Sequence, residues 1–129
     1  MEKPESLTQS IPVPAAEYLY DLSILEEMGD NEYMAEVLGI FLRDTPFELK
    51  EMKTALYTGN AKIIAQQAHK IKGSAGIIQA AELCGLLDRI EKAAKTETAG
   101  DILKSLIENT LRQYNNIEQA LKKYIQELR

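Results

Sequence analysis

Residues 60–79 read NAKIIAQQAHKIKGSAGIIQ, and their apolar side chains recur with the period of an α-helix. The recurring positions follow one another at steps of four, three and four residues: Ile64, Ala68, Ile71 and Ala75. Such spacing places side chains on one face of a helix. Asn60 precedes this pattern, and asparagine is well suited to cap a helix at its start. The segment therefore predicts an amphipathic helix that packs through a stripe of small and aliphatic side chains.

The chain before this helix shows the same spacing from a capping residue at Asp30 or Asn31 to a glycine stop at Gly59. Pro46 interrupts the pattern, because proline lacks the backbone N–H that a helix interior uses. It either opens a new helix after Thr45 or lies within one continuous, kinked helix. The apolar stripe predicted here consists of Met34, Val37, Leu38, Phe41, Leu42, Phe47, Leu49, Met52 and Leu56.

Two further helices are expected after residue 80, joined by a polar loop over residues 95–101. The first begins near Ala80 and carries Leu83, Leu87, Ile90 and Ala94. The second spans about 101–128 and carries Leu103, Leu106, Thr110, Ile117, Leu121, Tyr124 and Leu128. A short helical turn over residues 22–28 ends at Gly29. The predicted fold is all-α, an antiparallel four-helix bundle with a short extra N-terminal helix.

The composition suits one globular domain, with 45% hydrophobic and 27% charged residues among 129. Residues 1–16 contain three prolines and are interpreted as a flexible lead-in, followed by a bundle domain over residues 17–129. A net charge of −5 argues against a nucleic-acid partner. No apolar run reaches the roughly 20 residues of a membrane span. We do not expect the first residues to act as a secretion signal, because they lack a basic region followed by an apolar core. A single cysteine, Cys84, suits a reducing compartment, so we expect a cytoplasmic protein. A bundle that buries its own apolar stripes can be a monomer, which is the state we expect.

The only histidine of the chain, His69, lies on the helix of residues 60–79, displaced from the apolar stripe toward solvent. Its neighbours at helical spacing include Lys72, Gly73 and Gly76. Each interior glycine destabilises a helix by about 1 kcal/mol relative to alanine. Two of them beside one histidine suggest that a bulky partner approaches the helix there. The ordinary alternatives are a surface histidine, a helix stop at Gly76 and close helix packing at Gly73.

The chemistry of these residue types fits acceptance of a phosphoryl group. A neutral imidazole is a competent nucleophile near pH 7, and Lys72, one helical turn away, would steady the new negative charge. The chain has no glycine-rich nucleotide loop, no conventional zinc site and no base that pairs with Ser74 in a triad. A partner must therefore bring the activated phosphate. The sequence predicts a phosphocarrier rather than a stand-alone enzyme.

The segment AHKIKGSAGIIQA at residues 68–80 closely resembles the signature of histidine-containing phosphotransfer domains, Ala-His-x-hydrophobic-Lys-Gly-Ser-Ala. Residues 29–69 are similar to the family upstream, with Gly-Asp at 29–30, Phe-Leu-x-Asp-x-Pro at 41–46 and Gly-Asn at 59–60. Residues 80–93, AAELCGLLDRIEKA, resemble the helix that follows the histidine. The chain departs from the family at Gln79, where glycine is common.

The resemblance implies that His69 accepts and donates the phosphoryl group, that Lys72 assists the phosphate and that Gly73 keeps the approach open. It implies receiver domains as partners, together with a hybrid sensor histidine kinase. No cofactor or metal is expected on this chain, because Mg²⁺ would be held by the receiver. The residues expected to contact the partner are Ala65, Gln66, Lys70, Gly76 and Gln79.

Two other functions remain open from the residues. The histidine-bearing domain of a chemotaxis-type kinase shares the pattern HxIKG, which would make this chain a fragment. A helical scaffold without phosphotransfer is the other. The dimerisation domain of an ordinary sensor kinase fits less well, because it places Glu or Asp after the histidine and Lys70 stands there instead.

Overall fold

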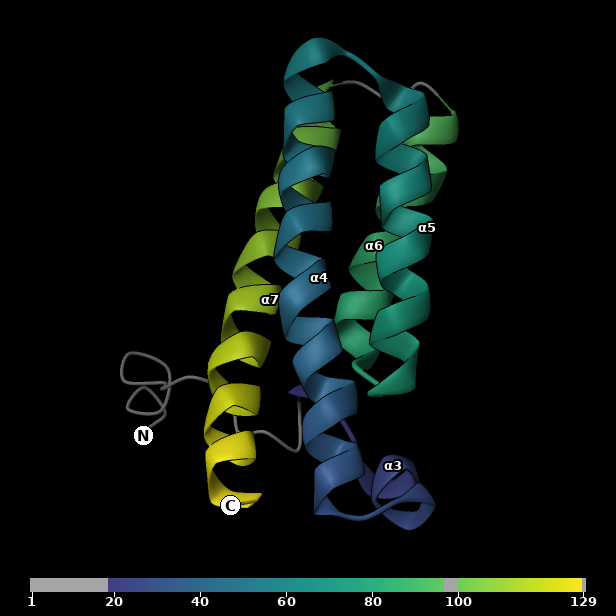
Figure 1. Ribbon diagram of the computed structural model, residues 1–129. Helices are drawn as coiled ribbons and strands as arrows, with labels where there is room; N and C mark the ends of the chain where they lie inside the picture. Colours follow the sequence, from purple (N-terminus) through teal and green to yellow (C-terminus); the bar gives the residue numbers. More distant parts are fainter. Residues whose placement is uncertain (1–18, 97–99, 129) are drawn as a thin grey trace, which may run out of the picture.

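The computed structural model describes residues 19–96 and 100–128, whose long helices form an antiparallel bundle (Figure 1). These helices are α4 (Asn31–Thr58), α5 (Ala61–Ile77), α6 (Ala81–Lys95) and α7 (Gly100–Leu128), preceded by the short α3 (Ser23–Met28). Contacts join α4 to α5, α5 to α6, α6 to α7 and α7 back to α4, so the four long helices close into a ring. The all-α bundle with a short extra helix is confirmed, and the described ranges contain no strand. The predicted lead-in over 1–16 lies outside the described residues.

Side-chain caps begin α4 and α5 where the sequence placed them. Asp30 Oδ1 accepts a hydrogen bond of 2.9 Å from the Tyr33 N–H at the start of α4. Asn60 Oδ1 accepts one of 3.1 Å from the Ile63 N–H at the start of α5. Both bonds satisfy backbone donors that the first turn of a helix leaves unpaired.

Pro46 lies inside α4, which is one continuous helix, so the alternative of a new helix after Thr45 is wrong. The helical phase continues through the proline, and the buried face of α4 consists of Met34, Leu38, Phe41, Thr45, Glu48, Leu49, Met52 and Ala55. Phe47 was predicted on this stripe, but its side chain is 63% exposed. It lies off the four-and-three-residue rhythm that runs from Phe41 through Thr45 and Glu48 to Met52.

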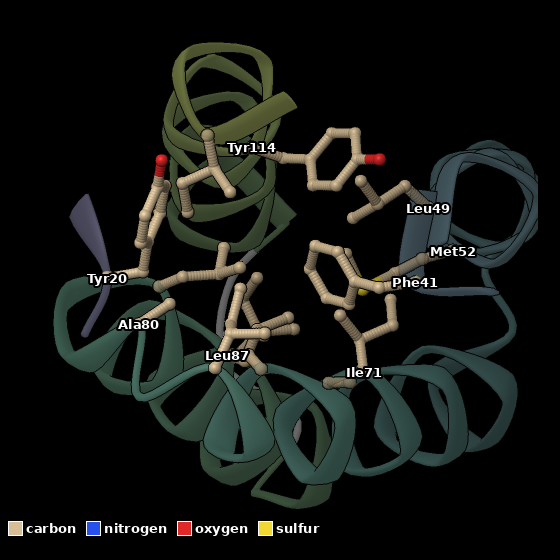
Figure 2. Packing of buried hydrophobic residues seen from close by; sticks show 14 of the residues in the cluster. Tyr20, Phe41, Leu49, Met52, Ile71, Ala80, Leu87 and Tyr114 are labelled. Carbon is tan, nitrogen blue, oxygen red and sulfur yellow. The ribbon is translucent and has the colours of Figure 1, made fainter. Parts of the chain in front are cut away.

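The core fills the space inside the ring of helices (Figure 2). Phe41 of α4 and Tyr114 of α7 pack with ring centroids 5.8 Å apart, and Ile71 and Leu87 reach the same interior from α5 and α6. The four stripe positions of α5 and the four of α6 are all buried as predicted. In α7 the core also takes Ile107 and Tyr114, which the sequence pattern missed.

The α3 region covers one end of the bundle, beside the start of α4 (Figure 1), and the hydroxyl of Tyr124 on α7 donates a hydrogen bond of 2.7 Å to Glu26 Oε2. It contributes four buried side chains, Leu19, Tyr20, Leu22 and Leu25. A backbone hydrogen bond of 3.0 Å runs from the Asp21 N–H to the Ile78 carbonyl, which ties this region to the end of α5. The α3 region therefore covers the core at the end of the bundle where α5 ends and α6 begins.

The turns on both sides of α5 contain a residue in the left-handed conformation, and only one of these two residues is glycine. Gly59 ends α4 in the left-handed region with φ of 71°, and Gln79 ends α5 with φ of 50°. In both turns the next residue donates to a carbonyl five residues back, Asn60 to Ala55 and Ala80 to Ala75. This is the Schellman arrangement, which favours glycine at the left-handed position. Gln79 thus occupies a position whose backbone conformation favours glycine.

We expect Gln79→Gly to stabilise the bundle, because glycine adopts the left-handed conformation without the steric penalty of a side chain. Glycine also has more conformational freedom in the unfolded chain, which offsets part of this effect. The expected net increase in the free energy of unfolding is about 0.5–1 kcal/mol, or about 2–4 °C in Tm. Thermal denaturation measures it. The matched control is Gln119→Gly, an exposed position inside α7, which should lower stability by about 1 kcal/mol. A destabilised Gln79→Gly protein would show that the side chain of Gln79 contributes more than its backbone strain removes.

Candidate functional site

His69 projects from the middle of α5 with its side chain 72% exposed. One nitrogen of its ring nevertheless has a partner, because Nδ1 lies 3.2 Å from Oε2 and 3.4 Å from Oε1 of Glu91 on α6. The core stripes of α5 and α6 hold these two residues side by side, since Ala68 and Ile90, their immediate chain neighbours, are both fully buried. The imidazole is thus anchored at one nitrogen and open at the other.

Glu91 is a buried carboxylate that gathers three partners. Lys72 donates to Oε1 at 2.9 Å, Lys95 donates to Oε2 at 3.0 Å, and the imidazole of His69 completes the set. These contacts, the Lys72 hydrogen bond first and the Lys95 one next, lower the pKa of Glu91 from 4.5 to about 2. Glu91 is therefore ionised at neutral pH and can only accept hydrogen bonds.

The charge of Glu91 determines the tautomer of His69. Because a carboxylate accepts, the ring nitrogen that faces it must carry the proton. Nδ1 of His69 is therefore the N–H, and Nε2 holds the free lone pair. The nucleophilic nitrogen is the one that points away from Glu91.

The depressed pKa of Glu91 predicts a loss of stability in acid. A carboxyl whose folded pKa lies below its unfolded pKa contributes stability above the unfolded value, near 4.5, and loses it as pH falls through about 2. After allowance for solvent screening of the exposed lysines, the contribution is about 1–2 kcal/mol. Urea unfolding at several pH values between 7 and 2 measures it. The pH dependence of Glu91→Gln should be weaker over this window, and identical pH dependence in the two proteins would contradict the assignment.

The predicted partner Lys72 lies at the site, but it is not free. Its ammonium donates to Glu91 and also to Asp88 Oδ1 at 3.0 Å, and both contacts raise the pKa of Lys72. Asp88 in turn pairs with Lys92 at 2.9 Å. Sequence reasoning found His69 and Lys72 but missed the acidic residues of α6 that join them.

The glycines beside His69 leave its approach open. A Cβ built on Gly73 or on Gly76 would meet no atom within 4 Å. Close helix packing at Gly73 is therefore wrong, and α5 continues past Gly76 to Ile77. Both glycines lie on the exposed side of α5, where a partner can approach the helix backbone.

The other predicted contact residues are distributed on both sides of His69. Ala65 is buried and Gln66 is exposed, and both line an open groove of about 460 Å³ that also includes His69. The groove lies between α5 and α6 and is completed by Ala61, Lys62, Glu91, Ala94 and Lys95. Lys70 lies on the opposite side of α5, where its Nζ is 3.2 Å from Glu48 Oε2 of α4. Gln79 lies at the end of α5, away from the groove.

In the part of the chain that the structure describes, no group of three or more His, Cys, Asp or Glu side chains is arranged to hold a metal ion. No helix among the same residues is long and apolar enough to cross a membrane.

A four-helix bundle that presents one exposed, carboxylate-anchored imidazole has the features of a histidine phosphotransfer domain. The family model of the Hpt domain matches residues 36–129, and the chain belongs to this family. The crystal structure of histidine-containing phosphotransfer protein B from Pseudomonas aeruginosa PAO1 is similar, with a TM-score of 0.79 and 28% sequence identity over 89% of this chain and 100% of that chain. No curated protein matches the chain in sequence. The family supports histidine phosphotransfer in phosphorelays, in which such domains work with receiver domains and kinases.

Proposed function

We propose that the chain accepts a phosphoryl group on Nε2 of His69 from the aspartyl phosphate of a receiver domain and donates it to another receiver. The observation that carries this proposal is the contact between Nδ1 of His69 and the ionised Glu91, which leaves Nε2 exposed with a free lone pair. A hybrid sensor histidine kinase is the expected source of the phosphate, and the cytoplasm is the expected location, where receiver domains act.

The transfer exchanges one bond to phosphorus for another. The Nε2 lone pair of His69 attacks the phosphorus in line, the bond from phosphorus to the aspartyl oxygen breaks, and the aspartate leaves as a carboxylate. The proton on Nδ1 stays in place, so the product is an N-phosphorylated imidazolium. Glu91 faces that developing positive charge and stabilises it.

The remaining residues of the site support this step. Lys72, one helical turn from His69, is the cation that would approach the phosphoryl oxygens, and Gly73 leaves room for them. The groove beside Ala65 and Gln66 would take part of the receiver surface. The receiver would hold the Mg²⁺, and this chain would act as a monomer and carrier without a cofactor of its own.

The test mixes the full chain with a panel of receiver domains, each phosphorylated with radiolabelled acetyl phosphate. We expect label on the chain from at least one receiver, and we expect that label to be lost in acid and stable in alkali, as a phosphohistidine is. A chain that binds a receiver but takes no label from any of them would be a scaffold, and the proposal would be wrong.

A further inference from the structure

The ammonium of Lys72 lies between two carboxylates of α6. Its Nζ is 3.0 Å from Asp88 Oδ1 and 2.9 Å from Glu91 Oε1, and its side chain is 30% exposed. An ammonium has three donors, so these bonds occupy two of them. In the unphosphorylated protein, therefore, the cation that would serve the phosphate already gives two of its three donors to carboxylates.

Each of these carboxylates has a second lysine of its own. Lys92 lies 2.9 Å from Asp88 Oδ2, and Lys95 lies 3.0 Å from Glu91 Oε2, both four residues further along α6. A carboxylate followed by a lysine at this spacing is a favourable pair on a helix. Lys72 can consequently leave either carboxylate without stranding a negative charge.

Phosphorylation of His69 would place a charge of nearly −2 one helical turn from Lys72. The phosphoryl oxygens and Asp88 would then compete for the same ammonium. Glu91 differs from Asp88, because it also contacts the imidazole and so acts on the nucleophile itself. The contacts of Asp88 are with Lys72 and Lys92, which makes it the residue through which the competition can be tested alone.

We propose that Asp88 determines how stable the phosphorylated form of His69 is, because it competes with the phosphoryl group for Lys72. This inference rests on the proposed function. On transfer to Nε2, Lys72 exchanges its hydrogen bond to Asp88 for one to a phosphoryl oxygen, and Asp88 keeps Lys92. Asp88 is thus a positioning residue that keeps the phosphoryl group transferable, as a carrier between two aspartates requires.

The test is the equilibrium partition of label between the chain and a receiver that phosphorylates the wild type. Asp88→Asn preserves the shape of the side chain and removes its charge, and the 38% exposure of Asp88 makes the fold tolerant of the change. We expect the partition to shift toward His69 by about fivefold, the size of a partly exposed ion pair. The control is Glu118→Gln, which removes a carboxylate from the pair with Lys122 on α7 and should leave the partition unchanged.

Asp88 could act by competing for Lys72 or simply by repelling the phosphoryl group through its negative charge. A double-mutant cycle separates these two effects. In a Lys72→Gln background, Asp88→Asn should shift the partition by less than twofold. A shift that stays fivefold there would overturn the inference. Phosphoramidate, a small-molecule donor, loads the Lys72→Gln proteins before the receiver is added, so slow transfer does not prevent the comparison.

The outcomes for this inference and for the proposed function are distinct. A wild type that takes label from no receiver contradicts the proposed function. Label on the wild type with the same partition for Asp88→Asn contradicts only the role of Asp88.

Discussion

His69→Gln should abolish phosphotransfer and leave the bundle folded. Glutamine offers an amide in place of the imidazole lone pair, and an amide nitrogen is not a nucleophile toward an acyl phosphate. We expect label on the variant to fall below about 0.1% of the wild type in the receiver assay. The result would assign the acceptor to the one histidine of the chain.

The fold of His69→Gln is expected to survive because the His69 side chain is largely exposed and its core neighbour Ala68 carries the packing. Surface substitutions of this kind usually change stability by within about 0.5 kcal/mol. Far-UV circular dichroism and thermal denaturation check this point. Loss of helix in the variant would show that the imidazole is part of the core, and full labelling would move the acceptor to another residue.

The helices of this protein were predictable from sequence because each carries a regular apolar stripe and a recognisable end. Asp30, Asn60 and Gly59 mark helix ends by their own chemistry, and the structure places all three in those roles. The prediction was ambiguous at Pro46, because proline disfavours a helix interior while the apolar stripe continues on both sides of it. The buried face continues through Thr45 and Glu48, so packing against the bundle outweighs the lost hydrogen bond of the proline.

Half of the candidate site was predictable in the same way. His69, Lys72 and Gly73 lie within one turn of each other, so helical spacing alone brings them together. Glu91 lies 22 residues further along the chain and on another helix, and only the antiparallel pairing of α5 and α6 brings it to His69. A signal was present, since Glu91 follows Leu87 by four residues, where an apolar side chain would continue the stripe. A carboxylate at such a position requires a partner.

Glu91→Gln should slow phosphotransfer by about 10- to 100-fold while His69 remains in place. The amide has no negative charge and can donate as well as accept, so it no longer fixes the proton on Nδ1 and the free lone pair on Nε2. The imidazolium of the product also loses its counter-charge. The wild-type contact that sets both effects is the 3.2 Å approach of Nδ1 to Oε2. Rapid-quench measurement of the first-order transfer step with the receiver measures the change.

A second buried carboxylate provides the matched control. Glu48 is as buried as Glu91 and also pairs with a lysine, Lys70, but it lies on α4 on the other side of α5. Glu48→Gln should therefore transfer phosphate within about threefold of the wild-type rate even if it lowers stability by a similar amount. Nitrogen-15 shifts of the His69 ring give an independent reading, because only Glu91→Gln should change the proportion of the Nδ1–H tautomer. Equal transfer rates for both variants, with an unchanged His69 tautomer, would contradict this prediction. Glu91 would then be only a structural ion pair that does not orient the imidazole.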